Sequence, residues 1–446
     1  MIERLRREFN ARYTAEGYAR LLTDLEARCG TAIRFRVAET PVFLPQALLD
    51  RLAETGRELT ERLLGDAGYL AAAEQSIPAG YRVAGESAHP HFMTADFALV
   101  RGGMRDGDGE LVPRLVELQA FPSVFGYQAV LAEEYRRAYG LGGERPGELR
   151  TYLSGLDEAG YWDLLRRTIV GSHAPEQVVL AEVTPERQKT LPDFRVTAER
   201  LGIAVVDIAE IEPAGRKLYY RDARGRQIEI RRIYNRAIAD EMMAKRVRLR
   251  FDLEAEWDVE WAGHPNWYFR VSKFALPWLS GSLGGDVKAH PCVPPAAFLE
   301  DFLAGPGYEA LRESGVRLPE RREAGAVYEE LLLKPLYSFA GKGIVFAPSD
   351  AELSAIPASE RGQYLVQQRM QFEPTVETPE GMTQAEIRIL YAWPDDGQMT
   401  AAISLVRLGR GKMMGVDHNR DMEWVGASAA FGVGNAQKLE KSTPFR

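Results

Sequence analysis

The chain has 446 residues, of which 45% are hydrophobic and 27% are charged, and its formal net charge is −8. This composition is typical of a globular protein that can bury two or three hydrophobic cores. An acidic chain disfavours nonspecific binding to nucleic acid or anionic membranes, so a phosphate site must be a local feature. Cys29 and Cys292 give neither a metal-ligand spacing nor a disulfide framework, which favours a cytoplasmic protein. Residues 1–8 are too charged for a signal peptide, and no apolar run approaches a membrane span.

The first 66 residues are predicted to be mainly helical. Apolar residues recur at helical spacing over residues 18–28 and again over 46–64. Between these segments, residues 33–37 have a strand pattern, and the prolines of 41–45 predict an irregular connector. The helical faces are most simply explained as core.

An acidic hairpin is predicted next. The repeated Asp-Gly at 106–109 predicts a tight turn, and the return strand covers 111–118. Asp96 lies on the outgoing strand, whereas Glu117 and Gln119 share one face at the end of the returning one. Two carboxylates and an amide oxygen are hard ligands suited to Mg²⁺. A solvated hairpin face is the alternative interpretation.

A small α/β unit follows two predicted helices at 127–139 and 158–170. Residues 177–183, 193–201 and 202–208 have the pattern of a strand, a helix and a second strand. These spacings predict a crossover connection between parallel strands. A hairpin of strands 217–224 and 227–234 is predicted after them.

Arginines alternate at the end of that hairpin, from Arg231 to Arg236. Guanidinium groups can hold a substrate carboxylate through paired hydrogen bonds. Charged runs of this kind are also common on solvent-exposed faces. The arginines of this run are therefore candidate contacts for an acid substrate.

Residues 328–388 have the features of a nucleotide-binding unit. Lys334 interrupts an apolar strand pattern, and Gly341-Lys342-Gly343 ends a turn that starts at residue 338, before the apolar run 344–346. Glycines let backbone N–H groups approach phosphate oxygens, while an inward lysine neutralises their charge. An ordinary hairpin with a lysine that reaches solvent is the alternative.

Three later strands carry polar groups. The first, 364–368, ends in two glutamines whose amides can meet an adenine edge. The second alternates, with Glu386 and Arg388 on one face, which predicts a polar site. The third ends in Arg407, a candidate contact for phosphate or substrate.

The order of these parts resembles the ATP-grasp superfamily, and more closely its circularly permuted members, the glutathionylspermidine synthetase-like group. In that group an Asp on one strand and Glu-x-Asn on the next, followed by a proline, bind magnesium. Asp96, the segment Glu117-Leu118-Gln119 and Pro122 look similar. This chain departs by having Gln119 in place of asparagine. It also has Thr94 where the group often has a phosphate-contacting arginine.

The resemblance implies a mixed α+β and α/β protein with a circularly permuted ATP-grasp fold. Residues 1–150 would supply N-terminal helices and the metal hairpin, 151–280 a small preceding α/β domain, and 281–446 the nucleotide-binding subdomains. It implies ATP and Mg²⁺ as cofactors. A small or peptide-like carboxylate would be joined to an amine or thiol through an acylphosphate, with release of ADP and phosphate. A small-metabolite kinase and a non-catalytic nucleotide-binding protein are the alternatives, and the products distinguish them.

Residue chemistry and the resemblance together assign the candidate site. The expected metal ligands are Asp96, Glu117 and Gln119. The expected nucleotide contacts are Lys334, Gly341, Lys342, Gly343, Gln367 and Gln368. The groups expected to act on the transferring phosphoryl group are Lys334, Arg388 and Arg407. The expected substrate contacts are Asn235, Arg236, Lys273 and Glu386. No Ser-His-Asp or Cys-His pattern supports nucleophilic catalysis instead.

Overall fold

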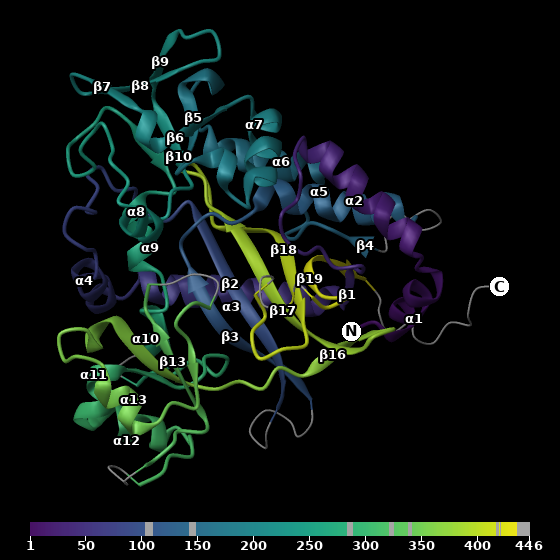
Figure 1. Cartoon of the computed structure of the whole chain (residues 1–446), viewed down its shortest axis with the longest axis vertical. Helices are drawn as coiled ribbons and strands as arrows, with labels where there is room; N and C mark the ends of the chain where they lie inside the picture. Colours follow the sequence, from purple (N-terminus) through teal and green to yellow (C-terminus); the bar gives the residue numbers. More distant parts are fainter. Residues whose placement is uncertain are drawn as a thin grey trace.

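Four β-sheets with flanking helices make up the architecture (Figure 1). The structure is a computed structural model that describes residues 1–102, 110–141, 149–282, 289–320, 325–337, 341–415, 419 and 421–434. The mixed α/β class predicted from the sequence is confirmed. Within these residues, no helix combines the length and the apolar character needed to cross a membrane.

The largest sheet has the order β1-β19-β18-β17-β2-β3, with β16 paired to β17 and β4 to β19. Its strands are β1 (Val42–Pro45), β2 (Phe92–Arg101), β3 (Leu111–Gln119), β4 (Leu149–Arg150), β16 (Pro374–Thr378), β17 (Gly381–Ala392), β18 (Thr400–Gly409) and β19 (Gly426–Val433). The early hairpin β2-β3 lies beside strands from the C-terminal part of the chain (Figure 1). In this register Asp96 is opposite both Glu117 on β3 and Arg388 on β17.

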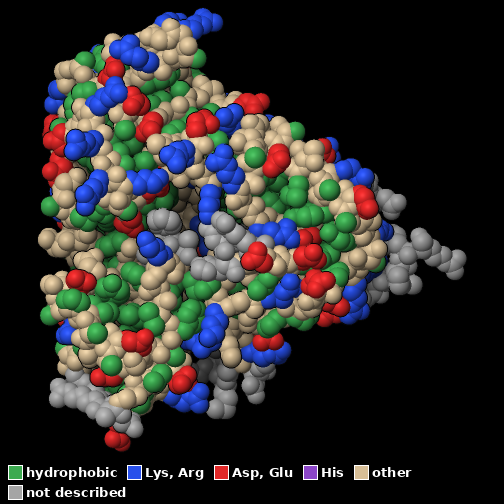
Figure 2. Space-filling model, in the orientation of Figure 1, with side chains coloured by type: hydrophobic (Ala, Val, Ile, Leu, Met, Phe, Trp, Pro, Cys, Tyr) green, Lys and Arg blue, Asp and Glu red, His purple; other side chains and the backbone are tan. Residues whose placement is uncertain are grey.

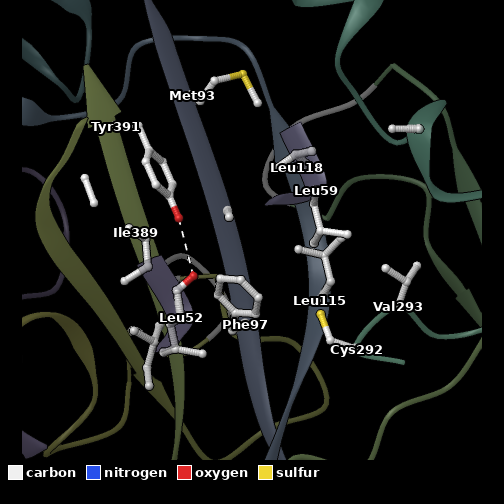
Figure 3. Packing of buried hydrophobic residues seen from close by; sticks show 14 of the residues in the cluster. Leu52, Leu59, Met93, Phe97, Leu115, Leu118, Cys292, Val293, Ile389 and Tyr391 are labelled. Atoms are coloured by element: carbon white, nitrogen blue, oxygen red, sulfur yellow. Dashed lines mark hydrogen bonds between the residues drawn. The ribbon is translucent and has the colours of Figure 1, made fainter. Parts of the chain in front are cut away.

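One face of the large sheet packs against the long helix α3 (Gln46–Leu64). Apolar residues of α3 at helical spacing meet the inward residues of the strands, as Figure 3 shows for Leu52, Phe97 and Ile389. The buried hydroxyl of Tyr391 donates a hydrogen bond to the carbonyl oxygen of Ala53 at 2.8 Å. This contact ties the helix to the centre of the sheet.

The opposite face of β17 changes character along the strand. Leu390 and Ala392 belong to an apolar cluster that includes Leu164 and Leu165 of α6 (Glu158–Ile169). Glu386 and Arg388, at the other end of the same face, line a cavity instead. The strand therefore alternates as predicted. One face belongs to the hydrophobic core, and the other face divides along its length between core and cavity.

A parallel sheet of order β11-β10-β5-β6 forms the second unit. Its strands are β5 (Val178–Glu182), β6 (Ala204–Asp207), β10 (Arg232–Asn235) and β11 (Glu260–Ala262). Helix α7 (Leu191–Leu201) joins β5 to β6, which confirms the predicted crossover. A separate three-stranded sheet contains β7 (Glu212–Ala214), β8 (Lys217–Arg221) and β9 (Gln227–Ile230).

The strand predicted at 227–234 is two strands in the structure. Its first part, β9, pairs with β8, and its second part, β10, pairs in parallel with β5. At Arg231 the backbone N–H donates to the carbonyl oxygen of Gln177, so the chain leaves the hairpin there. The prediction of one continuous strand was wrong because an alternating pattern does not reveal a change of pairing partner.

The antiparallel sheet β12-β15-β13-β14 forms the third unit. Its strands are β12 (Ala296–Phe298), β13 (Leu331–Pro335), β14 (Val345–Phe346) and β15 (Tyr364–Gln368). Leu331, Leu333 and Val366 pack with apolar residues of the neighbouring helices α11 (Leu299–Ala304), α12 (Pro306–Glu313) and α13 (Asp350–Ala355). This sheet carries Lys334.

The N-terminal segment differs from the sequence prediction in two places. Residues 33–37 form only one bridge, between Val37 and Ala427. The predicted connector at 41–45 contains β1, which pairs in parallel with β19. Pro41 precedes the strand and Pro45 is its last residue, and β1 lies at the edge of the sheet, where prolines are tolerated. The remaining helices are α1 (Glu3–Arg12), α2 (Ala15–Cys29), α4 (Ala67–Gln75), α5 (Phe125–Ala138), α8 (Ala239–Lys245), α9 (Pro265–Arg270) and α10 (Ala275–Leu279).

Substitution of Gly426 by alanine is expected to lower the free energy of unfolding by at least about 1–3 kcal/mol. Gly426 has φ +118, and a β-carbon there would collide with the backbone carbonyl of Arg36. Chemical denaturation measures the loss, and Gly362→Ala is the matched control because its β-carbon would enter open space. Equal stability of the two variants would contradict the close approach at Gly426.

Candidate functional site

A cavity of about 1290 Å³ is lined by residues of the large sheet, the parallel sheet and the third sheet. Twelve Lys and Arg side chains line it against six Asp and Glu side chains, whereas the whole chain has a net charge of −8. In Figure 2, Lys and Arg side chains border the recess near the middle of the view. Such a concentration of positive charge in a concave site favours a polyanionic ligand.

Asp96 lines the cavity and is bound by two arginines. Its Oδ1 accepts a hydrogen bond from Arg388 Nε at 2.5 Å, and its Oδ2 accepts from Arg388 Nη2 at 2.6 Å. Arg407 Nη2 donates to the same Oδ2 at 2.7 Å. Burial on its own would raise the pKa of Asp96, but the two guanidinium groups outweigh it and hold that pKa below its ordinary value.

Glu386 lies on the same face of β17 as Arg388. Its Oε1 is 3.0 Å from Arg407 Nη1, and its side chain is 7% exposed. Burial raises the pKa of this carboxyl, and the nearby Asp96 raises it further, against the lowering effect of the arginines. Arg407 therefore bridges two acids on neighbouring strands.

The three predicted metal ligands lie on one wall of the cavity. Glu117 Oε1 is 3.1 Å from Lys273 Nζ and accepts a hydrogen bond from Gln119 Nε2 at 2.9 Å. Among the described residues, no group of three Asp, Glu, His or Cys side chains is arranged to hold a metal ion. The predicted set has two carboxylates and an amide, and both carboxylates already contact cationic side chains.

Lys334 is buried in β13 but lines the cavity. Its Nζ donates to Gln367 Oε1 at 2.6 Å. Burial lowers the pKa of Lys334 to about 8, although the nearby carboxylate of Glu117 acts in the opposite direction. Lys334 is thus close enough to Glu117 for their charges to interact.

The other predicted nucleotide contacts divide into two groups. Gly341, Lys342 and Gly343 line the cavity, and the positive φ angles of both glycines favour glycine. The first residues of the predicted turn, 338–340, lie outside the described residues. Gln367 and Gln368 are not among the cavity-lining residues. Gln367 is fully buried, and it orients Lys334 through the hydrogen bond that its Oε1 accepts from the lysine.

The predicted substrate contacts also differ in position. Lys273, Glu386 and Arg236 line the cavity, whereas Asn235 does not. Arg236 Nη1 donates to the carbonyl oxygens of Pro122, at 2.8 Å, and Ser123. The Ser123 hydroxyl in turn accepts from Arg388 Nη1 at 3.3 Å. In these contacts Arg236 holds the turn that follows β3.

Sequence reasoning missed Glu182 and Arg369, which also line the cavity. Glu182 is the last residue of β5, and Arg369 follows directly after β15. A signal for Glu182 was present, because ligands commonly bind at the carboxyl ends of parallel strands.

The fold is similar to that of solved proteins. A glutathione synthetase-like effector from Globodera pallida, in its apo form, aligns with a TM-score of 0.50 over 94% of this chain and 98% of that chain, at 12% identity. A putative gamma-glutamylcysteine synthetase from Methylobacillus flagellatus aligns at 14% identity with a TM-score of 0.36, covering 80% of this chain and 84% of that chain. No family model and no curated protein sequence matches the chain. The first alignment shows a common fold and nothing finer.

Proposed function

We propose that this protein is an ATP- and Mg²⁺-dependent ligase that joins a carboxylate to an amine or thiol on a circularly permuted ATP-grasp fold. The observation that carries the proposal is the pairing of β2 with β17. This pairing brings Asp96 and Arg388 together on the wall of the cavity that Lys334 also lines. The fold shared with the glutathione synthetase-like effector supports the same class.

The size and charge of the cavity suit this reaction. Sites for a single small ligand commonly measure about 300–1000 Å³. A cavity of about 1290 Å³ has room for a nucleotide and for the groups that are joined. Lys334, Arg388 and Arg407 would neutralise the phosphates, which is the main protein contribution to phosphoryl transfer.

The chemical steps follow from these groups. A substrate carboxylate oxygen attacks the γ-phosphorus, and the bond to ADP breaks, which yields an acylphosphate. The nucleophile then attacks the acyl carbon, phosphate leaves with the bonding electrons, and the nucleophile loses a proton. Arg388 and Arg407 would stabilise the negative charge of the transferring group. The hydrogen bonds that both donate to the carboxylate of Asp96 support this role, because they show that these groups can bind an anion here.

Mg²⁺ would be held by Asp96, Glu117 and Gln119, and it would supply further neutralisation of phosphate charge. The donor set fits the ion in ligand type, but cationic side chains already compensate both carboxylates. Magnesium bound to a triphosphate would fit this site better than magnesium alone. The phosphate oxygens would give Arg388 and Arg407 new hydrogen-bond partners in place of Asp96, and Asp96 would then be released from them.

A non-catalytic polyphosphate-binding protein is the second candidate. The observation in its favour is that three hydrogen bonds from Arg388 and Arg407 already use both oxygens of Asp96, which leaves little acceptor capacity for a metal. This candidate predicts nucleotide binding with no turnover, whereas the ligase predicts release of ADP.

Replacement of Glu117 by glutamine is expected to reduce acylphosphate formation at least 100-fold while the fold stays intact. Mg-ATP and a panel of carboxylic acids are supplied with hydroxylamine, which traps an acylphosphate as a coloured hydroxamate. Glu110→Gln, an exposed acid before β3, is the matched control and should retain full activity. ATP binding without hydroxamate or ADP from the parent protein would favour the binding protein, and a stable phosphorylated acceptor would favour a kinase.

A further inference from the structure

Glu182 occupies a distinctive place in the cavity. It ends β5 at the carboxyl edge of the parallel sheet, the edge at which open parallel sheets commonly bind ligands. Its side chain is 4% exposed and lines the cavity. The nucleotide-binding groups proposed above come instead from the large sheet and the third sheet.

Among the described residues, five of the six acids that line the cavity have a side chain that hydrogen-bonds or ion-pairs with them. These partners are Arg388 for Asp96, Lys273 for Glu117, Arg407 for Glu386 through an ion pair, Tyr268 for Asp240, and Gln188 and Lys245 for Glu241. Glu182 has a backbone donor alone: its Oε1 accepts from the Val183 N–H at 2.7 Å, and no described side chain hydrogen-bonds or ion-pairs with it. A buried carboxyl that lines a cavity and has only a backbone donor keeps acceptor capacity for a ligand.

The surroundings of Glu182 indicate the chemistry of that ligand. Burial raises the pKa of Glu182 to about 8, and it is opposed by the Val183 N–H and the charge of Arg236. The carboxylate of Glu241 raises this pKa further, and Lys245 lowers it. An amine offers two or three N–H donors and takes a positive charge, whereas a thiol is a weak donor. An amine therefore satisfies this carboxyl better than a thiol does.

We propose that Glu182 binds the amino group of the nucleophilic substrate as a cation and takes one of its protons as the amine attacks, so that the proposed ligase forms an amide rather than a thioester. This inference rests on the proposed function for its reaction, but the subsite can be tested by binding alone. Glu182 comes from the parallel sheet, whereas the arginines that hold Asp96 come from the large sheet.

Isothermal titration calorimetry with ethanolamine and 2-mercaptoethanol tests the subsite, because these probes differ only in the amine and the thiol. We expect ethanolamine to bind the full chain at least tenfold more tightly. In two sulfonate buffers of different ionisation enthalpy, its binding as a cation should release nearly one proton at pH 6.5, because Glu182 ionises on binding. That release should fall to about half a proton at pH 8, close to the pKa of Glu182.

Glu182→Gln should abolish both the preference for the amine and the proton release, and Glu182→Asp should retain the release. Glu241→Gln is the matched control: it should keep the preference and move the proton release to lower pH, since Glu241 raises the pKa of Glu182. Equal affinity for the two probes, or an unchanged preference in Glu182→Gln, would overturn the inference. Thermal unfolding confirms that each variant is folded.

Separate measurements distinguish this inference from the proposed function. Amine binding that depends on Glu182 in a chain that does not bind ATP would support the subsite and refute the ligase. Turnover of ATP that is faster with thiols than with amines would support the ligase and refute the subsite.

Discussion

Replacement of Lys334 by methionine is expected to raise the Kd for ATP by about 10- to 100-fold, the range for loss of one charge-assisted hydrogen bond. The methionine preserves most of the buried volume but removes the ammonium group from the cavity wall. Equilibrium titration with ATP measures the change. Lys217→Met, which removes a lysine paired with Glu229 on the β8-β9 hairpin, is the matched control and should leave the Kd unchanged.

Stability and affinity can be separated at this position. Lys334→Met leaves the buried Oε1 of Gln367 without its donor, which should destabilise the fold by about 1–3 kcal/mol. The double variant Lys334→Met with Gln367→Leu removes both partners, so its stability should recover while its affinity for ATP does not. Recovery of affinity in the double variant would place Lys334 outside the nucleotide site.

Replacement of Asp96 by asparagine is expected to lower the free energy of unfolding by about 3–5 kcal/mol, because it removes the buried carboxylate that two partly buried guanidinium groups share. Turnover should also be lost. Urea denaturation at pH 7 measures the stability, and the added change Arg407→Gln should recover part of it by removing one of the uncompensated charges. Strict additivity of the two substitutions would contradict the bridging role of Asp96.

The stability difference between the parent protein and Asp96→Asn should depend on pH. The pKa of Asp96 is lower in the folded chain than its ordinary value near 4. Its stabilising contribution is therefore complete above the unfolded-state pKa and is lost as the pH falls through the folded-state pKa. We expect the difference to be constant from pH 8 to 5 and to shrink below pH 4.

Much of the fold could be predicted because long strands and helices have clear periodicity. The helix at 46–64 and the strand that contains Arg388 were found from their apolar spacing. The strand β19 was not predicted, because its small residues Gly426 to Val433 are all buried and give little alternation. The short strand β1 lies between prolines and depends on β19 for its pairing.

The types of residue in the site could be predicted, but their partners could not. Asp96 and Arg388 are 292 positions apart in the chain, and no local pattern specifies that they meet. The same limit applies to Arg236, which hydrogen-bonds to the turn after β3, and to Gln367, which accepts a hydrogen bond from Lys334. Glu182 was missed because an acid becomes notable only when tertiary packing buries it without a side-chain partner.

The pairing of β2 with β17 has a consequence for biosynthesis. At about 5–20 residues per second, a ribosome needs roughly 15–60 s to extend the chain from Asp96 to Arg388. During that interval the edge of β2 that pairs with β17 has exposed backbone donors and acceptors, and exposed strand edges promote aggregation. The newly made N-terminal quarter must therefore be shielded, by chaperones or by its own helices, until β17 leaves the exit tunnel.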